Sequence, residues 1–160
     1  MLFSIPPIAM SSLWEIPFIA LLGFVVGCCA ALFMTVLKTA LRYADKPVLP
    51  RLALAGYITG CCALVAPQVM GIGYDSLNAA LANELSITLL LTLIFAKIIA
   101  TAASNGLGMP IGIIGPNLLI GACIGSAMGD LGAELFPELA SNHSFYVLLG
   151  MGAMMGAVLN

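Results

Sequence analysis

Gly106-Leu-Gly-Met-Pro-Ile-Gly-Ile-Ile-Gly-Pro116 is the stretch that decides the fold, and the apolar run from Asn117 to Gly129 follows it. Four glycines and two prolines in eleven residues cannot form the middle of a helix, because both residue types oppose helical backbone. Long apolar segments without Asp, Glu or Arg lie on both sides. The stretch therefore predicts irregular backbone at membrane depth, which is tolerated only where protein buries it or where it lines a polar cavity.

Pro116 suits the first position of a helix, because its missing N–H would have no helical partner there. We expect a helix to begin near Gly115 or Pro116, with free N–H groups and a partial charge of roughly +0.5 at its end. Such an end can bind an anion. Gly112 and Gly115 would let the N–H groups of Ile113 and Ile114 turn toward one point. The alternative is a simple helix break without a ligand.

The composition is that of an integral, multi-pass membrane protein. Of the 160 residues, 62% are hydrophobic and 8% are charged, whereas soluble domains carry about 25% charged residues. Short alternating strands are missing from the sequence, so we predict an all-α membrane protein. The net charge of −2 argues against nucleic acid as a partner. The five cysteines lie in apolar segments without metal-ligand spacing. We therefore expect no metal, no other cofactor and no enzymatic activity.

One membrane domain over residues 1–160 is expected to contain helices that differ greatly in length. The first is long enough to lie tilted across a core of ~30 Å, and the third is too short to span it. The last has no C-cap or polar tail, so we interpret it as truncated. This order is typical of transporters built from discontinuous helices. The predicted helices are about 14–42, 51–66, 74–82, 85–103, the 112–116 motif to about 133, and 145–160.

Small residues recur four positions apart in most of these helices and would give each a close-approach face. General helix packing can account for each pair. The row Gly121, Gly125 and Gly129 has more weight, because it lies on the helix that carries the proposed site and could hold that helix in place. The other pairs are Gly23/Gly27, Gly56/Gly60 and Gly152/Gly156.

The charged residues inside or between apolar segments have ordinary alternatives. Lys97 could mark an ion path, but its late position in a helix favours snorkelling to an interface. We interpret His143 as a solvated loop residue. Asp130, Glu134 and Glu138 are placed in an acidic loop and are expected to form a solvated rim rather than a metal site.

The motif at 112–116 resembles the signature G-x-F-x-P of the CLC family of chloride channels and chloride/proton antiporters. It stands here as Gly112-Ile-Ile-Gly-Pro116, preceded by Gly108-Met-Pro-Ile. The resemblance extends over nearly the whole chain. Its other matching segments are Pro67-Gln-Val-Met-Gly-Ile-Gly-Tyr74, Leu135-Phe-Pro137 and Phe145-Tyr-Val-Leu-Leu-Gly-Met-Gly-Ala-Met-Met-Gly156.

The resemblance implies chloride as the transported ligand, held in part by the backbone amides of Ile113 and Ile114. Ile114 replaces the family's Phe, which preserves an amide contact but removes the ring beside the ion. Gly115 replaces a common Ala, and we expect that change to be harmless. The resemblance also implies a homodimer, with the helix at 14–42 at the subunit contact.

Several family motifs are absent from this sequence. The serine motif G-S-G-I-P, the gating glutamate in G-R/K-E-G-P and the last-helix tyrosine do not occur. We therefore interpret the chain as the second half of a CLC-type inverted-repeat bundle, with the first repeat as its missing partner. The residues that are present do not distinguish a channel from an antiporter. The alternative function is a non-conducting membrane assembly or regulatory domain with a degenerate pore.

Basic residues surround the loop after the first helix, and they create a disagreement about orientation. Lys38, Arg42, Lys46 and Arg51 would make this loop cytoplasmic by the positive-inside rule. The family topology would place it outside, and we follow the family. A bacterial inner membrane or a plasma membrane is the expected location.

Overall fold

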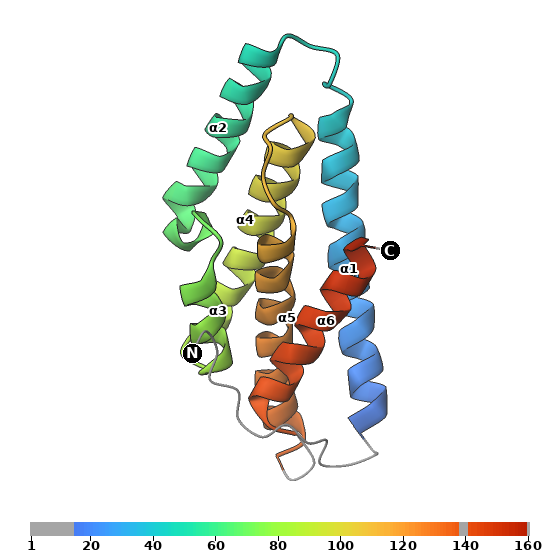
Figure 1. The fold of residues 1–160 in the computed structure, drawn as a ribbon. Coiled ribbons are helices and arrows are strands. Elements are labelled where there is room, and N and C mark those ends of the chain that lie inside the picture. The colour runs from blue at the N-terminus through green and yellow to red at the C-terminus, as the bar shows by residue number, and fades with distance from the viewer. Residues whose placement is uncertain (1–14, 138–140, 160) are drawn as a thin grey trace.

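The computed structural model describes residues 15–137 and 141–159, and within these ranges it contains helices and no strand. The all-α prediction is confirmed. The helices pack as a bundle in which α1, α4 and α5 lie side by side and α6 crosses α5 (Figure 1). The elements are α1 (Ile16–Leu41), α2 (Val48–Val65), the 3-10 helix η2 (Pro67–Val69), α3 (Tyr74–Leu81), α4 (Ile87–Gly106), α5 (Ile114–Leu135) and α6 (His143–Leu159).

Four of these helices, α1, α2, α4 and α5, are long and apolar enough to cross a membrane. The protein is therefore an integral membrane protein. Burial differs sharply among them: 67% of an 18-residue apolar stretch of α5 is buried, and 6% of such a stretch of α2. Hence α5 forms the centre of this bundle, and α2 presents most of its surface outward. The helix α3 has 8 residues, which is too few to span a bilayer.

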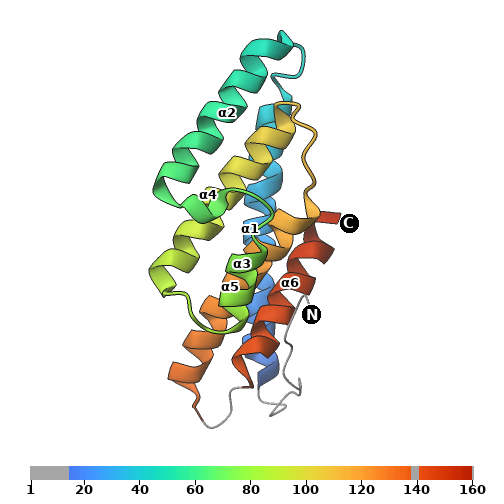
Figure 2. The same cartoon turned by 60° about the vertical axis from the view of Figure 1, so that its left-hand side comes forward.

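The start of α5 differs slightly from the prediction. The helix begins at Ile114 with Ile113 as its N-cap, so Pro116 occupies the third helical position instead of the first. The difference is small in energy because an N–H at the third position also lacks a helical partner. Figures 1 and 2 both show α5 beginning about halfway along the bundle, after a non-helical segment that descends from the end of α4.

The end of α4 also lies later than expected. The helix continues through Gly106, whereas the sequence predicted an end at about residue 103. A Cβ at Gly106 would lie 2.5 Å from Ala40 Cβ and 2.8 Å from the Leu37 carbonyl oxygen of α1. Close packing against α1 therefore keeps these residues helical, and the chain turns only at Gly108, where φ is +94°.

The row of glycines on α5 lies against α6. A Cβ at Gly121 would meet the carbonyl oxygen of Gly150 at 2.4 Å, and one at Gly125 would meet that of Tyr146 at 2.2 Å. The two backbones therefore touch directly. For the other pairs the prediction stays untested, because they meet no neighbour within the described part of the chain. No atom lies within 4 Å of the Cβ position at Gly23, Gly27, Gly56, Gly60, Gly152 or Gly156.

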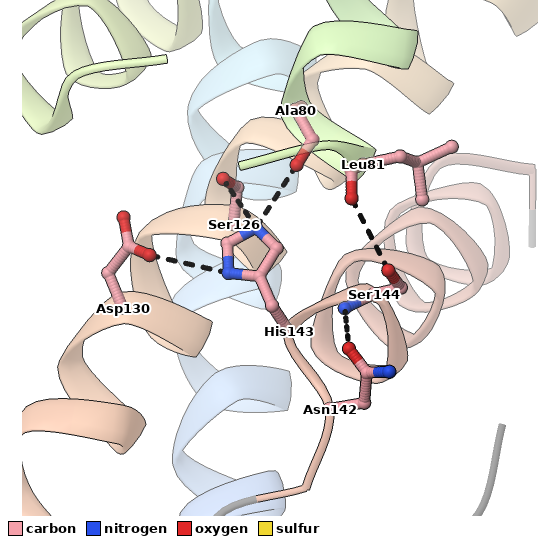
Figure 3. A network of polar contacts seen from close by, with 7 residues as sticks. All are labelled: Ala80, Leu81, Ser126, Asp130, Asn142, His143 and Ser144. Atoms are coloured by element: carbon pink, nitrogen blue, oxygen red, sulfur yellow. Dashed lines mark hydrogen bonds and ion pairs between the residues drawn. The ribbon is translucent and has the colours of Figure 1, made fainter. Parts of the chain in front are cut away.

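Two corrections concern the expected acidic loop. Asp130 and Glu134 belong to α5, which continues to Leu135. His143 begins α6, and its ring, 16% exposed, contacts two other helices: Ala80 of α3, and Ser126 and Asp130 of α5 (Figure 3). These residues lie on α5 and α6, the two helices that pack against each other most extensively in the described chain. Glu138 lies outside the described residues.

A buried carboxylate joins the beginning of α1 to the beginning of α6. Glu15 is 5% exposed. Its Oε2 accepts a hydrogen bond from Ser141 Oγ at 2.6 Å, and its Oε1 accepts one from Tyr146 OH at 3.1 Å. These bonds satisfy the carboxylate where water is excluded. They fix α6 near the end of the molecule from which α1 starts.

Candidate functional site

The segment between α4 and α5 is an ordered turn. Met109 N–H donates to the Ser104 carbonyl at 3.0 Å, and Ile111 N–H donates to the Met109 carbonyl at 2.8 Å. Arg51 of α2 lies beside this turn: its Nη2 would be 2.9 Å from a Cβ at Gly108, and its Nη1 donates to the Ala44 carbonyl. The segment that leads into α5 is thus held by its own backbone hydrogen bonds and lies against the Arg51 side chain.

The first turn of α5 has backbone N–H groups without partners. The first helical bond there runs from Asn117 N–H to the Ile113 carbonyl, at 3.1 Å. Within the described part of the chain, the N–H groups of Ile113 and Ile114 donate to no acceptor. The Ile114 side chain is 55% exposed. The positive end of the α5 dipole is therefore open in this chain.

A cavity of about 570 Å³ lies beside the same turn. Gly112 and Pro116 line it on the α5 side, and Lys97, Thr101 and Ser104 line it from α4. The Ser104 hydroxyl is hydrogen-bonded to that of Thr59, 2.8 Å away on α2. The remaining lining residues are mostly apolar: Gly56, Gly60, Ala63, Val69, Met70, Gly71, Ile72, Ala100, Met109 and Ile111.

Lys97 does not snorkel to an interface, so the favoured prediction for it is wrong. Its side chain is 2% exposed. The Nζ donates to the carbonyl of Val69 at 2.7 Å and to that of Gly71 at 2.8 Å. The physical reason is the Gly/Pro turn after α2, residues 67–73. This turn folds back over α4 and supplies buried carbonyl acceptors to the ammonium group.

The turn held by Lys97 touches the start of α5. A Cβ at Gly115 would lie 2.7 Å from Ile72 Cγ2, and one at Gly73 would lie 2.6 Å from Leu119 Cδ2. Alanine at position 115 would therefore require the Ile72 side chain to move. Lys97 is connected through this turn to the helix end that carries the unpaired N–H groups.

Asn117 is a buried polar residue that the sequence reasoning missed. It is 0% exposed, and neither its Nδ2 nor its Oδ1 has a hydrogen-bond partner among the described residues. The sequence signal that could have identified it is a polar residue at the start of an otherwise apolar run. A buried amide without a partner is costly, and no hydrogen bond among the described residues offsets this cost.

The acidic residues do not form a cluster. Asp130 Oδ1 lies 3.3 Å from His143 Nδ1, while Glu134 is exposed. Among the described residues, no group of three His, Cys, Asp or Glu side chains could hold a metal ion.

The bundle and this site define an all-helical integral membrane protein with a helix that begins inside the bundle. The chain belongs to the voltage gated chloride channel family, whose sequence model matches residues 1–160. This confirms the resemblance described above.

Curated relatives support the same assignment. The H(+)/Cl(−) exchange transporter ClcA of Salmonella agona (strain SL483) is 34% identical over 94 residues, which cover 59% of this chain and 20% of that protein. A protein of the same name from Salmonella arizonae is 30% identical over 143 residues, covering 85% of this chain and 30% of that protein. The chain thus spans less than a third of the length of these relatives.

Proposed function

We propose that this chain forms one wall of a chloride pathway and that the backbone N–H groups of Ile113 and Ile114 are ligands of the anion. Gly112, Gly115 and Pro116 support this geometry. The single observation that carries the proposal is the helix end inside the bundle, with N–H groups that have no acceptor in the described chain. Fixed peptide dipoles stabilise an anion without the tight binding of a full charge, and conduction needs both entry and release.

The surroundings of the helix end fit a polar guest. The cavity beside Gly112 and Pro116 contains the Lys97 side chain in its wall. The relatives are named as H(+)/Cl(−) exchangers. We infer that the complete protein also contains a first repeat that covers the exposed Ile114 side and supplies the other wall.

Anion flux through the complete protein in liposomes tests the proposed function. Chloride efflux is measured with an electrode in the presence of a potassium ionophore, which carries the compensating charge, with and without a protonophore. Efflux in either condition supports transport, and a dependence on the protonophore separates an antiporter from a channel. Folded protein that moves no chloride would favour the alternative, a non-conducting assembly or regulatory domain.

Removal of individual N–H groups tests the proposed ligands. Replacing the amide at Ile113 or Ile114 by an ester deletes one donor and leaves the side chain in place. We expect chloride binding to weaken by at least about tenfold for each ester, since a hydrogen bond to a charged group contributes about 1.5–3 kcal/mol. Binding is measured by calorimetric titration of the complete protein.

An ester at Asn117 is the matched control for this experiment. Its N–H is occupied by the Ile113 carbonyl, so its loss should weaken the helix and leave chloride affinity nearly unchanged. Equal affinity in wild-type protein and in both the Ile113 and Ile114 esters would remove these amides from the site.

We propose that two copies of the complete protein form a homodimer through α1, in a bacterial inner membrane or plasma membrane. The outer face of α1 supports this, since Ile16, Leu21 and Phe24 are 55%, 50% and 70% exposed. Cross-linking between cysteines introduced at Phe24 tests the contact. Failure to cross-link in membranes would argue against it.

A further inference from the structure

A groove of about 310 Å³ lies where α1, α2 and α4 meet. The helices α1 and α2 each pack against α4 and hardly touch each other. Figure 1 shows α1 and α2 diverging from the loop that joins them, with α4 between. The buried residues Ala103 and Leu107, at the end of α4, form the floor of the groove, which is therefore left open between α1 and α2.

The groove presents an apolar surface although two threonines line it. Thr35 Oγ1 donates to the Ala31 carbonyl at 2.7 Å, and Thr39 Oγ1 donates to the Thr35 carbonyl at 2.8 Å. Both hydroxyls are thus engaged within α1. Apart from Tyr43, the other lining residues have aliphatic side chains. Such a surface suits a hydrocarbon chain rather than a polar ligand.

The groove has nearly the depth of one lipid leaflet. Along α1 and the turn that follows, it extends from Thr35 to Tyr43, which is about 12 Å at a rise of about 1.5 Å per residue. Half of a hydrocarbon core of ~30 Å is about 15 Å. Tyr43 is 50% exposed, and tyrosine is enriched where hydrocarbon meets the headgroups. The Tyr43 end of the groove therefore corresponds to the headgroup level.

The basic residues of the chain gather at this end of the groove. Four of the five Lys and Arg residues lie on or beside the loop that joins α1 to α2, and they have Asp45 as the one acidic residue among them. This leaves an excess of three positive charges. Within residues 15–137 and 141–159, none of the four forms an ion pair. The four are Lys38, Arg42, Lys46 and Arg51.

Two of these charges are adjacent to lining residues on α1. Lys38 precedes Thr39 and Arg42 precedes Tyr43 in the sequence, and both basic residues are exposed. A long basic side chain can lie along apolar surface with its charge at the membrane boundary. An anion at the Tyr43 end would thus be within the field of both.

Arg51 brings a third charge from α2. It lies one helical turn before Leu54, which lines the groove. Its Nη1 donates to the Ala44 carbonyl, and its buried Nε has no partner among the described residues. The guanidinium group is therefore held beside the loop without an acidic partner.

We propose that this groove binds an anionic phospholipid, with an acyl chain between α1 and α2 and the phosphate headgroup at the four basic residues. Basic pockets between transmembrane helices bind anionic lipid headgroups. The positive charges and the apolar groove are then parts of one site, and the charges do more than set the orientation of the loop. This site is separate from the proposed chloride pathway.

Titration of the complete protein in non-ionic micelles tests the proposal, with bound lipids counted by native mass spectrometry. The probes are phosphatidylglycerol and phosphatidylcholine with the same acyl chains, and glycerol phosphate as a soluble headgroup. Phosphatidylglycerol should bind at least about tenfold more tightly than phosphatidylcholine, because each nearby Lys or Arg contributes about fivefold. Glycerol phosphate should not compete at equal concentration, since it lacks the chain that fills the groove.

Three variants separate the charges from the groove. Arg42→Gln should weaken phosphatidylglycerol binding about fivefold. Gln68→Glu is its matched control: it lowers the net charge equally, but in η2, beyond the opposite end of α2, so the affinity should stay within about twofold. Thr39→Trp fills the groove without changing the charge and should weaken binding of both lipids.

Three results would overturn the proposal. Equal binding of the two lipids to the wild-type protein would show that the basic residues recognise no headgroup. Unchanged phosphatidylglycerol binding in folded Thr39→Trp would show that the charges act without the groove. Competition by glycerol phosphate at equal concentration would identify a soluble phosphate ester, and not a lipid, as the ligand.

Discussion

Gly125→Ala is expected to lower the free energy of unfolding by about 3 kcal/mol or more, since overpacking typically costs about 1–3 kcal/mol and occasionally more. The new methyl carbon would lie 2.2 Å from the Tyr146 carbonyl oxygen and 2.6 Å from Val147 Cα. Both atoms belong to the backbone of α6, so no side-chain rotation can relieve the contact. The helices α5 and α6 would have to separate.

Separation would affect more than one contact. The α6 backbone meets α5 again at Gly121, and α5 packs more extensively against α6 than against any other described helix. Lipid tails are as apolar as the side chains of a helix, so there is no hydrophobic driving force that brings helices together in lipid. Close packing at small residues is therefore a main source of helix association there. We therefore expect the substitution to weaken the whole contact between α5 and α6.

Gly152→Ala is the matched control, since it makes the same chemical change within α6. No atom lies within 4 Å of its Cβ position, and alanine is the better helix former by about 1 kcal/mol. Its unfolding free energy in detergent micelles should be equal to or higher than that of the wild type. A Gly125→Ala protein as stable as Gly152→Ala would show that the two backbones do not touch as described.

The sequence predicts the helices well and their contacts poorly, for a physical reason. Hydropathy and the Gly/Pro clusters are local properties, and they locate the break before α5 within a few residues. Which glycine row touches a neighbour depends on how helices distant in sequence pack. Gly121 and Gly125 meet α6, whereas Gly152 meets nothing within 4 Å, although the spacing of the glycines is the same.

The two misplaced polar residues illustrate the same limit. Lys97 was assigned to an interface because it lies late in its helix, and His143 was assigned to a solvated loop because its neighbours in sequence are polar. Their acceptors lie 26 to 28 residues away for Lys97 and 63 residues away at the Ala80 carbonyl for His143. Backbone carbonyls carry no residue-specific signal, so the sequence cannot indicate that a turn will supply them.

Lys97→Met is expected to destabilise the protein by about 3 kcal/mol, because a buried acceptor without its donor costs about 1–3 kcal/mol. Methionine fills nearly the same volume but cannot donate to the carbonyls of Val69 and Gly71, which the lysine holds at 2.7 and 2.8 Å. The 67–73 turn should then loosen. Hydrogen exchange at its amides and unfolding in micelles measure the two effects.

Lys38→Met provides the control for this change, because it removes an exposed lysine from the last turn of α1. Its effect should stay within about 0.5 kcal/mol. Lys97→Arg should recover part of the stability, since it retains N–H donors on a long side chain.

Chloride affinity provides a separate readout. The turn held by Lys97 packs through Ile72 against Gly115, so a loosened turn should let the start of α5 move and weaken anion binding in the complete protein. A Lys97→Met protein with an ordered turn and wild-type stability would show that the ammonium group does not hold this segment. The link from α4 to the proposed anion site would then be lost.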